Sequence, residues 1–245
     1  MPLRSPSSPA IAISTFPRSD PSLARFRNPA SRSVLVIGLG RFGSAVADSL
    51  VRMGQEVLGV DENPTLVNRW ADELTHVVQA DCTDDEALRQ LGVADYDRAV
   101  VAIGTDIEAS VLTVLALAEA GVPDIWAKAI TRKHGQILER VGAHHVVYPE
   151  YSMGERVAHM LTGGMMDYIE FDDEFSIART LAPSFTWDKT LAESAPRSKH
   201  GVTIVGVKRT GEDFTYARPE TTVHRHDHLI VSGPTSKVEK FCNIR

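Results

Sequence analysis

Short apolar runs alternate with amphipathic stretches from residue 34 to about residue 150. The runs are rich in Val, Ile or Ala and do not alternate between apolar and polar positions. This is typical of parallel strands that are buried on both faces of a sheet. Six runs predict strands at 34–37, 57–60, 77–80, 99–103, 125–129 and 146–148. Strands that alternate with helices indicate an α/β fold, a Rossmann-like doubly wound parallel sheet with right-handed crossovers.

The segments between these runs have the spacing of helices. Phe42, Val46 and Leu50 recur every four residues, which predicts one apolar side of a helix after the first strand. Asp106 is placed to cap a later helix, and Gly121 is placed to end it. We therefore expect a nucleotide-binding type of Rossmann domain over 33–150.

Beyond residue 150 the pattern changes to a smaller unit. A connecting helix at 152–161 is followed by Gly163-Gly164, which is either a hinge or only a helix stop, so 151–164 is predicted as connecting helix and hinge. Residues 165–245 predict a small α+β subdomain of about 80 residues, near the lower limit for an independent domain. Its expected elements are strands at 168–171, 175–181, 202–207 and 229–231, short helices at 188–194 and 236–241, and a turn at 209–213.

Composition narrows the class of protein. The 245 residues are 43% hydrophobic and carry a net charge of -6, which argues against a general nucleic-acid binder because such proteins present a basic surface. Two cysteines, Cys82 and Cys242, form no disulfide framework and no metal-type spacing, so a reducing cytosol fits. No apolar run reaches the roughly 18 residues that a membrane span needs.

Residues 1–32 differ from the remainder. They are rich in serine, proline and arginine and contain one acid, Asp20. Such a segment has too little apolar surface to order itself, so we predict a disordered basic tail. A transit peptide, a misassigned start codon and a lipid-touching tail are alternatives that the sequence leaves open.

A glycine motif marks the end of the first predicted strand. Gly38, Gly40 and Gly43 form a GxGxxG, in which the first glycine permits the turn, the second admits a pyrophosphate and the third lets the helix pack closely. The free N–H groups of the following helix favour phosphates. Asp61 ends the next strand, where an acid accepts hydrogen bonds from ribose hydroxyls and repels a 2′-phosphate. A ligand-free glycine turn is the alternative.

Other polar groups follow later strands at the same edge of the sheet. Asp81 and Cys82 follow the third strand, Gly104 follows the fourth, and Lys128 lies in the fifth. Open α/β sheets bind ligands at this edge, so these residues are candidates for contact with base, ribose or phosphate. Helix capping by Asp81 and a solvated Lys128 are the equally weighted alternatives.

The order and spacing of several motifs resemble RCK domains (regulators of potassium conductance) of the Trk/Ktr type, made of a TrkA-N and a TrkA-C domain. The resemblance spans about residues 33–243. It is carried by V-I-G-L-G-R-F-G at 36–43, E-V-L-G-V-D-E-N at 56–63, Q-A-D-C-T-D at 79–84, V-A-I-G at 101–104, W-A-K-A at 126–129, L-E-R-V-G-A at 138–143, V-Y-P-E at 147–150 and D-H-L-I-V-S-G at 227–233.

This resemblance implies a cytoplasmic regulatory subunit, peripheral at the inner face of the plasma membrane. It implies a homo-oligomer, a dimer or octameric ring, beneath a membrane potassium-translocating subunit of the Trk/Ktr type. ATP, ADP or NAD(H) would bind each Rossmann unit and change the shape of the ring. No nucleic-acid partner is implied.

The resemblance also implies roles for single residues. The three glycines and Phe42 would surround the phosphates, with Gly104 and Lys128 near the phosphate end. Arg41 would reach the terminal phosphate of ATP, Asp61 the ribose, and Asp81 with Cys82 the adenine. Glu150 would hold a divalent cation (Mg²⁺ or Ca²⁺) between subunits, although one carboxylate per chain is a poor metal site unless symmetry supplies a second. A solvated Arg41 and a capping Glu150 are the alternatives.

The second half offers no clear effector site. In related proteins cyclic di-AMP occupies some C-terminal subdomains, but no residue pattern here establishes it. His224, His226 and His228 alternate and would share one face if they lay on a strand, as a metal or pH-sensitive site or as incidental residues of an exposed strand. The family usually has a Gly-Asp turn where this chain reads His226-Asp227.

An NAD(H)-dependent oxidoreductase and a free-standing redox sensor are the competing functions. An oxidoreductase needs an acid or base facing the nicotinamide. His134, His144 and His145 are the available bases, but they lie in or beside the last strand–helix segment and form no recognisable constellation. We therefore expect a regulatory protein that is not an enzyme.

Overall fold

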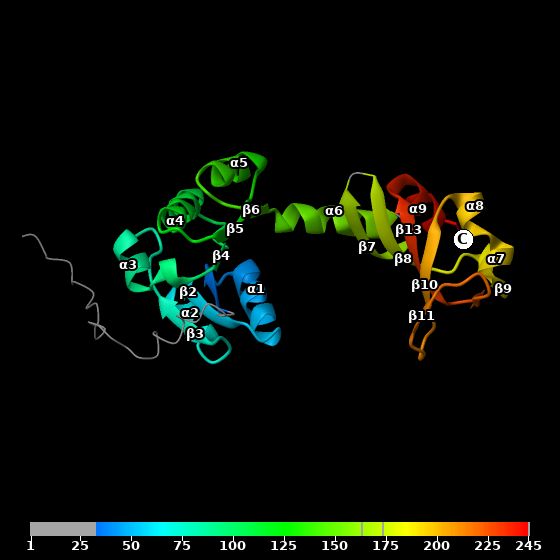
Figure 1. Ribbon diagram of the computed structural model, residues 1–245, viewed down its shortest axis with the longest axis horizontal. Helices are drawn as coiled ribbons and strands as arrows, with labels where there is room; N and C mark the ends of the chain where they lie inside the picture. The colour runs from blue at the N-terminus through cyan, green and yellow to red at the C-terminus, as the bar shows by residue number, and fades with distance from the viewer. Residues whose placement is uncertain (1–32, 163, 173, 245) are drawn as a thin grey trace, which may run out of the picture. The chain divides into compact units, whose positions relative to one another are not determined.

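The computed structural model describes residues 33–162, 164–172 and 174–244, and the predicted tail 1–32 lies outside them. The chain divides into two compact units, with the boundary between Tyr148 and Pro149 (Figure 1). Within the described residues, no helix is both long enough and apolar enough to span a bilayer.

The first unit is a six-stranded parallel sheet in the order β3-β2-β1-β4-β5-β6. This is the doubly wound order of dinucleotide-binding folds, in which the strand order reverses between β1 and β4. The Rossmann-like prediction is confirmed, and each strand lies within two residues of its predicted bounds. The strands are β1 (Ser33–Ile37), β2 (Glu56–Asp61), β3 (His76–Gln79), β4 (Arg98–Val101), β5 (Asp124–Lys128) and β6 (His145–Val147).

The strands lack alternation because both faces of the sheet are covered. Val34 and Val36 of β1 join one buried cluster, whereas Leu35 and Ile37 join another on the opposite face. Residues of α1 and α2 contribute to the first cluster, and residues of α3, α4 and α5 to the second. The helices are α1 (Arg41–Arg52), α2 (Pro64–Trp70), α3 (Asp85–Gln90), α4 (Ile107–Glu119) and α5 (Arg132–Arg140).

The buried side of α1 differs from the predicted apolar row. Gly43, Ser44 and Ala47 are the buried residues of this helix, whereas Phe42 and Val46 are only half-buried. Small residues face the sheet because the helix lies close to it, as the third glycine of the motif requires. The prediction for α4 was correct, since the Asp106 carboxylate accepts the Ala109 N–H at 3.0 Å and caps the helix.

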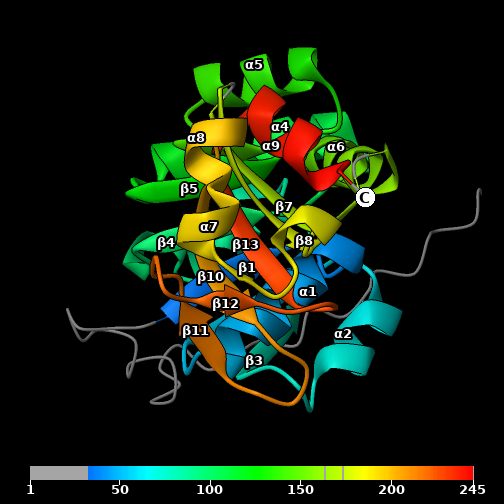
Figure 2. The ribbon, with the colours of Figure 1, turned by 90° about the vertical axis from the view of Figure 1, so that its right-hand side faces the viewer.

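The second unit is built on a five-stranded antiparallel sheet in the order β11-β10-β13-β8-β7. Helix α9 (Thr235–Cys242) packs on β8 and β13 of this sheet (Figure 2). Val238 and Phe241 of α9 are fully buried against the sheet and form the centre of its core. The strands are β7 (Met165–Asp172), β8 (Phe175–Leu181), β10 (Thr203–Lys208), β11 (Phe214–Tyr216) and β13 (His228–Pro234), with β9 (Lys189–Thr190) and β12 (Thr222–Val223) as a separate pair.

The predicted connecting helix belongs to the second unit. It is α6 (Pro149–Thr162), and it packs on β7. The His159 ring stacks on the Tyr168 ring with 4.4 Å between centroids, and His159 Nδ1 lies 3.1 Å from Glu239 Oε1. Gly163 lies outside the described residues. A Cβ on Gly164 would lie 2.5 Å from the Cys242 carbonyl oxygen, so Gly164 is held in packing and fits the helix-stop alternative better than a hinge.

Two predictions for the second unit were wrong in detail. The helix expected at 188–194 is instead the short strand β9 followed by the one-turn helix α7 (Leu191–Ser194), because Thr190 forms a capping box with Glu193 and starts the helix late. The pattern of residues also did not predict β11, β12 or the short helix α8 (Pro196–His200). The histidine segment is a turn and is described below.

Candidate nucleotide-binding edge

The glycine loop lies at the carboxyl end of β1. Gly38 has a φ of +90°, and its N–H donates to the Val60 carbonyl oxygen at 2.8 Å. A Cβ on Gly43 would lie 1.8 Å from the Gly38 carbonyl oxygen, so α1 reaches this depth only with glycine at position 43. A Cβ on Gly40 would meet nothing within 4 Å. The space above Gly40 is therefore open, as a site for a ligand requires.

The amino terminus of α1 points into this open space. Gly40 is its N-cap and supplies no side-chain hydrogen bond, and no acidic residue lies in the first turn. The first N–H groups of a helix carry the positive end of its dipole and are left for an external acceptor. Arg41 is exposed at the first position of the helix and adds a positive charge. This end of α1 can therefore hold a phosphate.

Asp61 connects the loop to β2. Its Oδ2 accepts the Leu39 N–H at 2.6 Å, and its Oδ1 accepts the Asn63 N–H at 2.8 Å. The carboxylate is only half-buried, and each oxygen has a second lone pair available. Asp61 can thus fix the loop and still accept a hydrogen bond from a ribose hydroxyl.

Asp81 and Cys82 follow β3. Asp81 Oδ1 accepts the Thr83 N–H at 2.9 Å and the Thr83 hydroxyl at 2.7 Å, and these hydrogen bonds hold the pKa of Asp81 below its usual value. Asp81 does not cap a helix, because Asp84 is the N-cap of α3. Burial, with the nearby charges of Asp81 and Asp61, raises the pKa of the Cys82 thiol to about 12. The thiol is therefore neutral and unreactive at physiological pH.

Three elements bring Phe42, Gly104 and Lys128 together. Lys128 Nζ lies 5.8 Å from the centroid of the Phe42 ring, and a Cβ on Gly104 would lie 3.0 Å from the same Nζ. Gly104 thus gives room to the Lys128 side chain, which crosses from β5 toward the start of α1. A second positive charge lies beside the helix terminus as a result.

Comparison with known protein sequences shows the family of this chain. Residues 34–149 match the TrkA-N domain and residues 187–245 the TrkA-C domain. Ktr system potassium uptake protein A of Bacillus subtilis (strain 168) is 37% identical over 222 residues, which are 90% of this chain and 99% of that protein. The chain belongs to the Ktr family of potassium uptake proteins. Ktr system potassium uptake protein C of the same organism is 38% identical over 84% of this chain and 94% of its own length.

Solved structures agree on the fold of this Ktr-family chain. The crystal structure of the GsuK RCK domain covers 91% of the chain with a TM-score of 0.62 and 21% identity. The GsuK channel bound to NAD covers 88% with a TM-score of 0.61 and 20% identity. The Ktr-family chain matches 52% of the first solved chain and 40% of the second. The resemblance to RCK domains is thus confirmed, and with it the fold.

Glu150 belongs to the second unit and not to the unit that carries the glycine loop. It is in the first turn of α6, in the second unit of the Ktr-family chain, and it is exposed. The described residues contain no group of three or more His, Cys, Asp or Glu side chains that could hold a metal ion. A divalent cation at Glu150 stays a prediction.

The histidines suggested as catalytic bases do not gather at the edge. His144 Nδ1 accepts the Ile125 N–H at 3.1 Å, and His145 stacks on Trp126 with 4.1 Å between centroids. His145 is the first residue of β6 and His144 precedes it, so both lie at the amino end of β6, opposite the ligand edge. His134 is buried in the first turn of α5, where burial lowers its pKa and Nδ1 accepts the Ile130 N–H. These three histidines therefore do not converge at the ligand edge.

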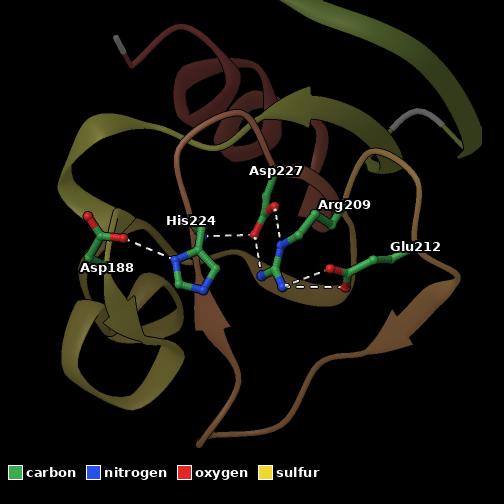
Figure 3. Close-up of polar contacts among 5 residues, drawn as sticks. All are labelled: Asp188, Arg209, Glu212, His224 and Asp227. Atoms are coloured by element: carbon green, nitrogen blue, oxygen red, sulfur yellow. Dashed lines mark hydrogen bonds and ion pairs between the residues drawn. The ribbon is translucent and has the colours of Figure 1, made fainter.

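The alternating histidines of this Ktr-family chain do not share one strand: His224 and His226 lie in the loop between β12 and β13, and His228 is the first residue of β13. Figure 3 shows His224 beside Asp188. His226 has a φ of +71°, the left-handed conformation that a glycine would adopt more easily. His224 Nδ1 lies 3.0 Å from Asp188 Oδ1, while His228 begins β13. The expectation that all three would share one face fails, because the turn reverses the chain between them.

Asp227 holds this turn in place. Its carboxylate is 1% exposed and accepts two hydrogen bonds from Arg209, Nε to Oδ1 at 3.0 Å and Nη2 to Oδ2 at 3.1 Å, and a third from the His224 N–H at 2.8 Å. Burial alone would raise the pKa of Asp227, but the Arg209 and His224 hydrogen bonds outweigh it and lower the pKa. Arg209 also contacts Glu212 (Figure 3). The charges and hydrogen-bonding groups of Arg209, Asp227 and the His224 N–H are thus paired with one another. We call this group the Asp227 clasp.

Proposed function

We propose that this chain is a nucleotide-binding regulatory subunit of a potassium uptake system and is not an enzyme. It acts on a membrane potassium-translocating subunit from the cytoplasmic face. The observation that carries the proposal is the open, donor-rich end of α1 in a chain that is 37% identical to a Ktr potassium uptake protein along nearly its whole length.

The edge of the sheet fits a nucleotide with its phosphates at α1. The N–H groups at Gly40–Gly43 and the Lys128 ammonium would hold the phosphates, and Asp61 would hold the ribose. Asp81 and Cys82 would lie beside the base. Arg41 would meet the terminal phosphate of ATP, since a guanidinium presents a fork of donors to phosphate oxygens.

Regulation requires that the nucleotide prefer one state of the assembly. A ligand shifts a conformational equilibrium only by its difference in affinity for the two states. We propose a homo-oligomer, a dimer or an octameric ring, in which ATP and ADP stabilise different packings. Symmetry would bring a second Glu150 to the first and so supply two carboxylates for a divalent cation.

Calorimetric titration of the purified full chain tests the ligand. ATP, ADP, NAD⁺ and NADH are each titrated with and without Mg²⁺; NAD⁺ and NADH are included because a channel that shares the fold binds NAD. We expect tight binding of adenosine phosphates with different affinities for ATP and ADP. A preference for NADH over NAD⁺ together with turnover of a substrate would replace the regulator by an oxidoreductase. Potassium flux in vesicles that hold the membrane subunit tests regulation, and a flux unaffected by nucleotide would contradict it.

Arg41→Ala separates the phosphate roles. We expect ATP affinity to fall about 10-fold or more and ADP affinity to change little, because one charge-assisted hydrogen bond to the terminal phosphate is lost. Arg52→Ala is the matched control, since Arg52 lies in the last turn of the same helix and pairs with Asp48. Equal losses for ATP and ADP in Arg41→Ala would refute a terminal-phosphate role.

A further inference from the structure

Leu39, the residue between the first two glycines of the loop, is anchored in the core. Its side chain is 1% exposed and belongs to the buried cluster between the sheet and α1. Loop residues at a ligand edge are ordinarily exposed. The burial of Leu39 therefore requires a space within the sheet that receives its side chain.

Gly59 in the middle of β2 provides this space. A Cβ on Gly59 would lie 3.1 Å and 3.2 Å from Leu39 Cδ2 and Cδ1, and 2.9 Å from Leu74 Cδ1. Gly59 pairs with Val36 of β1 and Val77 of β3, so it lies inside the sheet. Glycine weakens a strand and often marks a close approach by another group, and here two side chains approach, Leu74 and Leu39.

Three consecutive residues of β2 thus hold the loop. Gly59 receives the Leu39 side chain, the Val60 carbonyl oxygen accepts the Gly38 N–H at 2.8 Å, and Asp61 Oδ2 accepts the Leu39 N–H at 2.6 Å. One contact is apolar, one is between backbones and one is charge-assisted. Together they fix the height and tilt of the loop above the sheet before any ligand binds.

We propose that Gly59 is a positioning residue for the nucleotide: the missing side chain at position 59 seats Leu39 and so aims the N–H groups of the loop. This rests on the proposed nucleotide-binding function. Gly59 itself lies within the strand and acts through Leu39. Donors that are already aimed bind phosphate without the cost of ordering the loop, so a displaced Leu39 lowers affinity for every nucleotide that uses the loop.

Gly59→Ala in the full chain tests the proposal by titration with ATP and ADP. The added methyl group displaces both Leu74 and Leu39. The shift of Leu39 misaligns donors that both nucleotides share, so we expect both affinities to fall about 10-fold together. Val57→Ala is the matched control, since Val57 is fully buried in the same strand and the same cluster. It opens a cavity and lowers stability, yet it leaves position 59 unchanged, and we expect wild-type affinities.

Gly59→Ala combined with Leu39→Val supplies the rescue. A valine at 39 is one methylene group shorter and relieves the contact of the alanine with position 39, while the contact with Leu74 lies outside the glycine loop. We therefore expect affinity to return to within about 3-fold of the wild type. Wild-type affinity in Gly59→Ala, an equal loss in Val57→Ala, or no recovery in the double variant would each overturn the proposal. A wild-type chain that binds none of the nucleotides would instead overturn the proposed function and this inference with it.

Discussion

The glycine edge of the first unit and the Asp227 clasp of the second unit gather similar groups and use them differently. Each has a residue in the left-handed conformation, Gly38 at +90° and His226 at +71°, and a carboxylate that accepts backbone N–H groups. In the clasp, Arg209 and Asp227 satisfy each other. At the glycine edge the end of α1 has no side-chain cap among the described residues, and the space above Gly40 is open.

Because of this difference we propose a binding site at the glycine edge and a structural contact at Asp227. Buried or partly buried charges are stable when they are paired, and a paired group has little left to offer a ligand. Backbone N–H donors that lack an acceptor in the protein are typical of a helix amino terminus at which a bound anion supplies the acceptor. A groove of about 310 Å³ lies beside the clasp, lined in part by Arg209, Glu212 and His224, but Arg209 already pairs with Glu212 and Asp227, and His224 Nδ1 lies 3.0 Å from Asp188 Oδ1.

The largest effect should come from Gly43→Ala, which breaks the open edge. The new Cβ would lie 1.8 Å from a backbone oxygen, so α1 must move away from β1. Loss of two or more charge-assisted hydrogen bonds should weaken nucleotide binding by about 100-fold or more, and overpacking should cost about 1–3 kcal/mol of stability. Calorimetric titration and thermal unfolding measure the two effects.

Gly154→Ala is the matched control for this glycine. Gly154 lies in α6, and a Cβ there would meet nothing within 4 Å. We expect unchanged nucleotide affinity and a slight gain in stability, because alanine favours the helix. Near-wild-type binding by Gly43→Ala would contradict the close packing of α1 on the sheet as the basis of the site.

Asp227→Ala should break the clasp and leave the binding edge intact. Removal of one partner of a buried pair costs about 3–5 kcal/mol, but Arg209 is partly exposed, so we expect a loss of about 2 kcal/mol from the second unit. Nucleotide affinity should stay at the wild-type level. Denaturant unfolding followed in parallel with titration checks both, and a large loss of affinity would show that the two regions are not independent.

Lowering the pH should weaken the Asp227 clasp without a mutation, because it protonates the Asp227 carboxylate. The pKa of Asp227 is lower in the folded chain than its ordinary value of 3.8, so its contribution to stability is fully present above that value. The contribution is lost as the pH falls through the folded pKa, where the carboxylate takes up a proton. Unfolding below pH 4 should therefore be less pH-dependent in Asp227→Ala than in the wild type.

The smallest effect should come from His226→Gly, a substitution in the turn that Asp227 holds. Glycine relieves the left-handed conformation of position 226 but adds entropy to the unfolded chain, so a net gain of about 0.5 kcal/mol is expected. His228→Gly is the control, because His228 lies in β13 and glycine there should lower stability. A loss of stability in His226→Gly, measured by denaturant unfolding, would show that the histidine side chain holds the turn through contacts.

Much of the fold could be predicted from the sequence because its signals are local. Six apolar runs without alternation predicted a parallel sheet, and Asp106 and Gly121 predicted the ends of α4. The glycine spacing predicted the turn at Gly38 and the close packing of α1 at Gly43, whereas the ligand at this edge stays a prediction. The failures at 188–194 and 224–228 concern short segments with different causes. The Thr190–Glu193 capping box that starts α7 at Leu191 is a local pattern that can be read from the sequence, whereas the Arg209–Asp227 pair joins residues 18 positions apart.

The sequence by itself determined the order of strands and helices and the presence of a glycine loop, because periodicity and turn residues act over a few positions. Only the tertiary structure decided that the buried Asp227 takes its charge partner from Arg209, and that Leu39 finds its space at Gly59. The physical reason is that burial and steric fit depend on residues about 20 positions apart. Their distances are fixed only when β2 lies beside β1, and when the loops next to β10 and β13 meet.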